Sequence, residues 1–175
     1  MRILKFKKLG LYSKKRQKEI VQKMKPWTII LAEEQISGYG RKGNFWYSPR
    51  GGLYFSVILP KAKIEDLQIM TILSAFCVAK ILKEDFQLEP FIKLPNDIYV
   101  RGKKICGILT ENLIFGKEIR ASIIGIGLNT NIEKFPENLK EKSTSLKIEL
   151  KSEINNNKVL ERIVKEMKNI FEKIA

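Results

Sequence analysis

A glycine-rich stretch with two adjacent basic residues is the first place in this sequence where an anion could bind. Ser37 to Trp46 reads SGYGRKGNFW, and its glycines follow the spacing G-x-G-x-x-G with Arg41 and Lys42 between them. The three glycines are Gly38, Gly40 and Gly43. Glycines let several backbone N–H groups converge, and arginine adds charge and forked donors. The stretch predicts a phosphate or carboxylate site; the alternative is a solvent-exposed loop without a ligand.

Two familiar readings of this spacing do not fit its surroundings. A dinucleotide fingerprint needs a helix directly after the glycines. Pro49, Gly51 and Gly52 make a helix there improbable, and the next segment has the composition of a strand. A protein-kinase loop needs H-R-D and D-F-G sequences elsewhere. The chain has neither a histidine nor D-F-G.

A second candidate constellation lies in KLPNDIYVRGKKICGILTE, which starts at Lys93. Asp97 and Lys104 lie on the two arms of an expected hairpin whose turn is near Gly102, so they could face one another. With Lys93 and Asn96 they could hold a magnesium-bound polyphosphate. The alternative is a surface salt bridge of less than about 1 kcal/mol.

A third candidate ends the apolar segment SIIGIGLNTN. Gly125 and Gly127 weaken a strand unless something must approach the backbone closely. Asn129 could then read an adenine edge with its paired donor and acceptor groups. The alternative is a tight strand exit, where Gly and Asn are common.

The elements that must position these residues follow from hydrophobic periodicity. We expect helices over 13–25, 65–84 and from Asn155 to the end, the last one amphipathic with Asn155 as N-cap. We expect strands over 27–35, 53–60, 90–100 and 105–115, and over the first half of 119–131. Within 90–100, Pro95 holds Leu94 extended, so we expect Asn96 and Asp97 to begin a new strand. The predicted fold is α+β, with a single mixed, mostly antiparallel sheet covered by helices.

Composition limits the function classes. We expect the 175 residues to form one domain, 1–175. The net charge of +14 favours an anionic partner, although its lysines are scattered. The absence of histidine removes the commonest general base and zinc ligand. Cys77 and Cys106 form no C-x-x-C pair, so we expect neither a disulfide framework nor a metal site built on them. The absence of long apolar runs predicts a cytoplasmic protein.

Taken in order, GYGRKGNFW, SPRGGLYFSVILP, KLPNDIYVRGKKICGIL and GIGLNTN resemble the catalytic domain of biotin protein ligases, over about Trp27 to Asn131. Within these segments, Tyr39 stands where that family often has arginine. The resemblance implies a class II synthetase-like fold with ATP and biotin as substrates and Mg²⁺ as cofactor. It implies formation of biotinyl-5′-AMP, followed by transfer of the biotinyl group to a lysine of a biotin carboxyl carrier protein.

The resemblance also implies a role for individual residues. Catalysis would fall to Arg41, Lys93, Asp97 and Lys104, with Asp97 as the magnesium ligand. Biotin would contact Gln35, Gly38, Arg41, Lys104 and Gly107. ATP would contact Gly40, Arg41, Gly43, Trp46, Lys93, Asn96 and Asn129. Such chemistry needs charge neutralisation and alignment more than a proton-transferring histidine.

Two other functions stay open at this point. A lipoate or octanoate attachment enzyme would share the architecture, and an octanoyl transferase would need a nucleophilic cysteine, whereas both cysteines are expected to be packing residues. A basic nucleic-acid-binding module would need a recognition helix or an aromatic RNA-binding motif, which the sequence lacks. We expect an acidic carrier domain as partner, no DNA and no membrane, with a homodimer left open. Because the chain lacks the additional N- and C-terminal domains found in the family, we do not expect a repressor.

Overall fold

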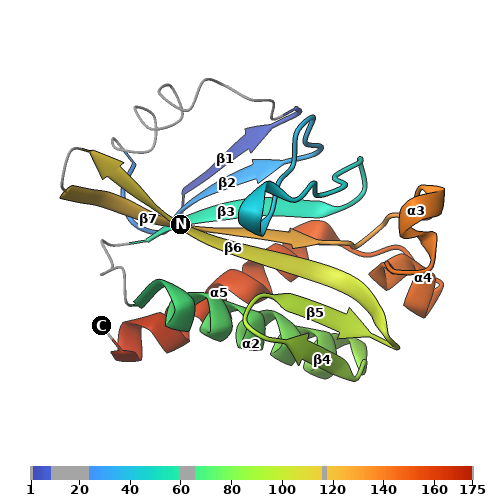
Figure 1. Cartoon of the computed structure of the whole chain (residues 1–175). Coiled ribbons are helices and arrows are strands. Elements are labelled where there is room, and N and C mark those ends of the chain that lie inside the picture. The colour runs from blue at the N-terminus through green and yellow to red at the C-terminus, as the bar shows by residue number, and fades with distance from the viewer. Residues whose placement is uncertain (1, 9–23, 60–65, 116–117, 175) are drawn as a thin grey trace.

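Seven strands form one sheet in the computed structural model, which describes residues 2–8, 24–59, 66–115 and 118–174 (Figure 1). The order across the sheet is β1-β2-β3-β7-β6-β5-β4. The β1–β2 pair is parallel and the other neighbouring pairs are antiparallel, which confirms the predicted mixed, mostly antiparallel sheet. The strands are β1 (Arg2–Phe6), β2 (Thr28–Ala32), β3 (Leu53–Leu59), β4 (Pro90–Lys93), β5 (Asp97–Val100), β6 (Lys103–Phe115) and β7 (Glu118–Leu128).

Two long helices, α2 (Asp66–Phe86) and α5 (Asn156–Ile174), cover one face of this sheet (Figure 1). The apolar stripe of α5 is buried as its periodicity predicts, at Val159, Leu160, Ile163, Val164, Met167 and Phe171. The Asn155 side chain accepts hydrogen bonds from the N–H groups of Asn157 and Lys158 at 3.1 Å, so the predicted N-cap is confirmed. The two helices and the sheet enclose the main core.

Several expected elements differ from the structure. The strand expected over 90–100 is interrupted after Lys93, because Pro95 has no N–H group to donate to a ladder. Strand β5 begins at Asp97, which confirms the new strand expected after Pro95. The strand expected over 27–35 ends at Ala32. The helix expected over 13–25 falls almost entirely on residues outside the described ranges. The sequence patterns did not predict β1 or the short helices η1 (Arg41–Gly43), α3 (Glu137–Lys140) and α4 (Leu146–Leu150).

The face of the sheet opposite α2 and α5 is the one that carries the candidate residues. Ile108 of β6 and Ile126 of β7 belong to the core, so strand alternation turns Gly107 and Gly127 to the other face. These two glycines are paired across the strands. The segment between β2 and β3 contains the predicted glycine loop and η1, and it lies over this open face (Figure 1).

Bilayer-spanning helices need both length and apolar character. Within the described ranges, no helix combines the two.

Candidate functional site

The glycine loop, residues 38–46, folds back on itself as a small hairpin. Tyr39 and Phe45 form an isolated antiparallel bridge, and the Trp46 N–H donates to the Gly38 carbonyl at 2.9 Å. The N–H of Gly40 donates to Asn44 and that of Gly43 donates to Gly40. In this conformation Gly40 and Gly43 therefore use their N–H groups inside the loop and do not present them to an anion.

Glycine is needed in the loop for two different reasons. Gly43 has a φ of +73°, a left-handed conformation that L residues rarely adopt. At Gly38, a Cβ atom would lie 2.5 Å from the Ser48 hydroxyl oxygen and 2.8 Å from Gln35 Oε1, so a side chain would not fit. The Ser48 hydroxyl donates to Gln35 Oε1 at 2.7 Å. These contacts fix the Gln35 side chain against the base of the loop.

The Trp46 indole lies directly on the paired glycines of the sheet. A Cβ atom at Gly107 would lie 3.1 Å from Trp46 Cζ3, and one at Gly127 would overlap Trp46 Nε1. Only residues without a side chain allow the ring to lie this close to the strands. In this conformation the indole occupies the surface of Gly107, and the biotin contact expected for Gly107 stays a prediction.

Four polar side chains connect the loop to β5 and β6. Arg41 Nη1 donates to Asn96 Oδ1 at 3.1 Å, and Asn96 Nδ2 donates to Asp97 Oδ1 at 2.8 Å. Lys104 Nζ lies 2.8 Å from Asp97 Oδ2, which confirms that Asp97 and Lys104 face one another across the hairpin. Lys104 Nζ also lies 5.1 Å from the Trp46 ring centroid, a cation–π distance. The chain of contacts thus runs from Arg41 to the indole.

In this conformation both oxygens of the Asp97 carboxylate have partners: one is paired with Lys104 and the other accepts from Asn96. The role of magnesium ligand stays a prediction, because a carboxylate oxygen with one such partner can still bind a metal. Among the described residues, no group of three or more His, Cys, Asp and Glu side chains could hold a metal ion. The Asp97 carboxylate also orients Lys104 by charge and hydrogen bonding.

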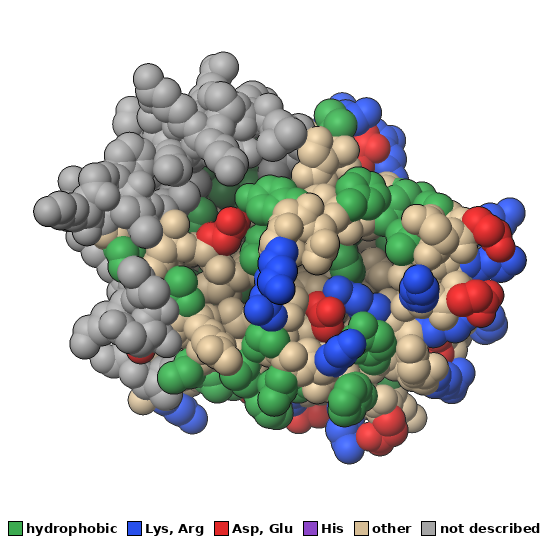
Figure 2. Space-filling view, in the orientation of Figure 1, with side chains coloured by type: hydrophobic (Ala, Val, Ile, Leu, Met, Phe, Trp, Pro, Cys, Tyr) green, Lys and Arg blue, Asp and Glu red, His purple; other side chains and the backbone are tan. Residues whose placement is uncertain are grey.

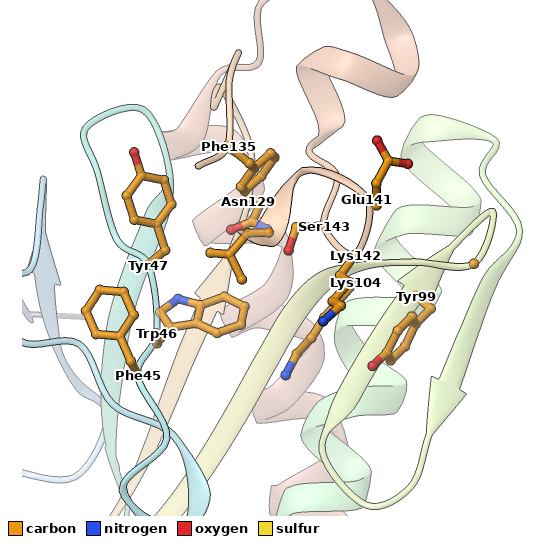
Figure 3. Close-up of a pocket in the computed structure, with 12 residues that line it drawn as sticks. Phe45, Trp46, Tyr47, Tyr99, Lys104, Asn129, Phe135, Glu141, Lys142 and Ser143 are labelled. Carbon is orange, nitrogen blue, oxygen red and sulfur yellow. The ribbon is translucent and has the colours of Figure 1, made fainter. Parts of the chain in front are cut away.

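A cavity of about 390 Å³ opens beside the indole, between the glycine loop, β6 and the segment that contains α3 (Figure 3). Trp46 points into it from one side and Lys104 from another, with Asn129, Phe135 and Ser143 opposite (Figure 3). The full lining is Phe45, Trp46, Tyr47, Tyr99, Gly102, Lys104, Asn129, Phe135, Leu139, Glu141, Lys142 and Ser143. Figure 2 shows Lys and Arg side chains around the middle of this face. The cavity thus combines aromatic walls with a basic rim.

Two buried polar atoms in this cavity have no hydrogen-bond partner among the described residues: Trp46 Nε1 and Asn129 Oδ1. Asn129 is 2% exposed, and its Nδ2 already donates to the Thr144 carbonyl at 3.0 Å. Asn129 therefore presents an acceptor oxygen without a partner among the described residues, while one of its two amide hydrogens is used by Thr144. A buried polar atom without a partner is costly, so a ligand donor at this oxygen would be favoured.

The comparison with protein families decides the relationship. The model of the biotin/lipoate A/B protein ligase family matches residues 11–129, more than half of the chain.

The chain belongs to the biotin/lipoate A/B protein ligase family.

Within this ligase family, curated proteins and solved structures are similar to different shares of the chain. A bifunctional ligase/repressor from Bacillus subtilis is 39% identical over 123 residues, covering 68% of this chain and 38% of that protein. A biotin–[acetyl-CoA-carboxylase] ligase from Paracoccus denitrificans is 31% identical over 106 residues, covering 57% of this chain and 43% of that protein. The chain thus spans about two fifths of these relatives. The biotin protein ligase from Aquifex aeolicus, solved with biotin and ATP, superposes with a TM-score of 0.85 at 29% identity, covering 98% of this chain and 71% of that one.

Lys93 lies farther from the cavity than Lys104 and its partners. Lys93 is exposed on the edge strand β4, with Nζ 5.9 Å from the centre of the Tyr99 ring. Its side chain is not among those that line the cavity.

The sequence-based prediction missed Tyr99, Phe135, Leu139 and Ser143, which line the cavity. Short helices and loops supply most of these walls, and no spacing rule in the sequence identifies them.

The segment 142–144 is fixed to Lys104 through the backbone. The Lys104 N–H donates to the Lys142 carbonyl at 2.8 Å, and the Thr144 N–H donates to the Lys104 carbonyl at 3.0 Å. Ser145 caps α4 by accepting from the Ile148 N–H. In this member of the ligase family, the cation and the opposite cavity wall are therefore one connected unit.

Proposed function

We propose that this chain activates biotin with ATP and transfers the biotinyl group to a lysine of a biotin carboxyl carrier protein. In the first step, a biotin carboxylate oxygen forms a bond to the α-phosphorus of ATP. The bond from that phosphorus to the bridging oxygen breaks, and pyrophosphate leaves with the electron pair. In the second step, the carrier lysine attacks the acyl carbon and AMP leaves.

The observation that carries this proposal is the position of the Lys104 ammonium and the unpartnered Asn129 oxygen in one cavity. Asn129 Oδ1 is a buried acceptor that suits the exocyclic amino group of adenine. Lys104, about one quarter exposed and oriented by Asp97, supplies positive charge next to the indole. A nucleotide whose base reached Asn129 would bring its phosphate toward this charge, where developing negative charge is stabilised.

The other residues have supporting roles in this proposal. Arg41, already positioned by Asn96, would hold the adenylate phosphate together with Lys104. Gln35 and Gly38 would border the biotin ring system at the base of the loop. Gly40 and Gly43 would give the loop its shape, and Lys93 would contact phosphate at the outer edge. Gly107 would serve by admitting Trp46 close to the strand, and Trp46 would close over the adenylate.

Ligand binding and pyrophosphate exchange together test the proposal. Biotin and ATP should each raise the melting temperature, since a ligand that binds only the folded state stabilises it by mass action. The chain should catalyse exchange of labelled pyrophosphate into ATP only when biotin is added. Exchange with lipoate and none with biotin would refute the biotin assignment and favour a lipoate enzyme. Steeply salt-dependent binding of DNA or RNA without exchange would favour a nucleic-acid-binding module instead.

Cysteine labelling should separate this function from octanoyl transfer through a thiol. Cys77 and Cys106 are both buried, as the sequence predicts. Burial raises the pKa of Cys77 to about 12 and raises the pKa of Cys106 further, so almost no thiolate exists at pH 8. We expect a thiol reagent at pH 8 to label both cysteines roughly 100-fold more slowly in the folded chain than in guanidinium. One cysteine that reacts quickly in the folded chain would contradict this assignment.

Arg41→Ala should release the adenylate prematurely. The guanidinium offers charge-assisted hydrogen bonds that alanine cannot make, so we expect biotinyl-5′-AMP to dissociate roughly 10- to 100-fold faster. Release can be measured by trapping the free adenylate and by labelling of an unrelated lysine-rich protein. Lys42→Ala removes a neighbouring exposed charge and is the matched control. Equal retention in Arg41→Ala and the unmodified chain would exclude this role.

A further inference from the structure

Tyr39 reaches across the open face of the sheet to a carboxylate on β6. Its hydroxyl donates to Glu111 Oε2 at 3.2 Å, although the two residues are 72 positions apart. We propose that Tyr39 and Glu111 form a positioning pair that holds the glycine loop closed over the sheet and so slows escape of the adenylate. The part that concerns the adenylate rests on the proposed function.

The loop transmits this contact to Trp46. Tyr39 is bridged to Phe45, and the Trp46 N–H donates to the Gly38 carbonyl, so the two arms of the loop move together. A bond that fixes Tyr39 therefore also fixes the arm that ends in the indole. None of these contacts involves Lys104 or Asn129, so the pair acts through the loop and not on the reacting atoms.

Strand register places the pair at a useful distance from the indole. Gly107, Leu109 and Glu111 alternate along β6 and share its open face. Four residues of strand span about 13 Å, so the two ends of this strip are well separated. Trp46 covers Gly107 at one end, and Tyr39 contacts Glu111 at the other. Leu109 and its partner Gly125 lie on the sheet between these two contacts.

The two sides of the loop are held by different groups. Arg41 bonds Asn96 beside β5, whereas Tyr39 bonds Glu111 on β6. Partial burial, and next the charge of Glu111, raise the pKa of the Tyr39 hydroxyl, in the direction that favours its protonated, donating form. Tyr39 is 48% exposed, so water competes with the bond and the pair stabilises the closed loop only moderately.

Limited proteolysis tests the pair without any ligand. Trypsin cleaves after Arg41 and Lys42, which lie at the exposed tip of the loop. We expect Tyr39→Phe and Glu111→Ala each to raise the cleavage rate at this tip roughly three- to tenfold. The double variant should be cleaved no faster than either single variant, since both remove one bond. Glu111→Gln keeps an acceptor oxygen and should restore most of the protection.

A matched control removes a hydroxyl nearby. Tyr47 lies against Phe135, with ring centroids 6.3 Å apart, and takes no part in the Tyr39–Glu111 contact, so Tyr47→Phe should leave the cleavage rate at the tip unchanged. Cleavage of Tyr39→Phe at the rate of the unmodified chain, or additive effects in the double variant, would overturn the pair.

A second measurement separates positioning from catalysis. Tyr39→Phe should speed dissociation of preformed biotinyl-5′-AMP roughly three- to tenfold and leave the single-turnover rate of its formation within about twofold. An unchanged dissociation rate would overturn the proposed effect on retention. If the unmodified chain forms no adenylate, the proposed function fails, while the trypsin result still decides whether the pair holds the loop.

Discussion

Lys104→Ala should lower the rate of biotinyl-5′-AMP formation about 10²- to 10³-fold. The reaction places extra negative charge on the α-phosphate oxygens, and a pre-positioned cation that stabilises developing charge contributes this much in comparable sites. Lys104 is pre-positioned because Asp97 holds its ammonium group at 2.8 Å and the Trp46 ring flanks it. Single-turnover formation of the adenylate, followed by rapid quench, measures the effect on chemistry alone.

The neighbouring lysine is the control for this experiment. Lys103 is also on β6, but its ammonium group lies by Glu141 and the Lys140 carbonyl, away from Asp97. Lys103→Ala removes the same charge from the protein and should change the rate less than about twofold. Equal losses in the two variants would mean that net charge, and not the position of Lys104, controls the reaction.

Gly127→Ala should weaken binding of ATP and biotin roughly 5- to 100-fold, the size expected for overpacking by one methyl group. The added Cβ would overlap Trp46 Nε1, so the indole must leave its place on the sheet. The backbone itself accepts alanine, because Gly127 is not among the glycines with positive φ. Calorimetric titration with each ligand measures the loss, and the melting temperature of the free chain reports on the fold.

Two further variants test whether the indole causes that loss. At Gly125, on the same face of β7, an added Cβ would meet its nearest atoms at 3.6 and 3.8 Å, which is ordinary contact. Gly125→Ala should therefore leave ATP binding nearly unchanged. In a Trp46→Ala background, Gly127→Ala should change ATP affinity less than about twofold, because the clashing ring is absent. A full additional loss in that background would refute the indole explanation.

The fold followed from the sequence wherever a regular pattern and a local turn signal agreed. Helix α5 was predictable because its apolar residues recur at helical spacing and Asn155 supplies a cap. The Asp97–Lys104 contact was predictable because Gly102 marks the turn that brings the two arms together. In both cases, local chemistry and tertiary packing favour the same structure.

The parts that escaped prediction depend on contacts between distant segments. Strand β1 has only five residues, and its pairing with β2 depends on residues more than twenty positions away. Helix α4 is also five residues long, too short for a periodic pattern. The sequence could not predict which atom of Asn129 stays without a partner. That depends on the hydrogen bond from Asn129 Nδ2 to the Thr144 carbonyl, 15 positions away in the chain. Composition gives no measure of which polar atoms remain unpaired.

The place of Trp46 on the paired glycines has a consequence for inhibitor design. The indole stands between the cavity that holds Asn129 and the open face over Leu109 and Gly125. A compound that reaches from this cavity onto the sheet over Leu109 and Gly125 must therefore bend around the ring. A short flexible linker that allows a sharp turn suits such a compound better than a straight, rigid one.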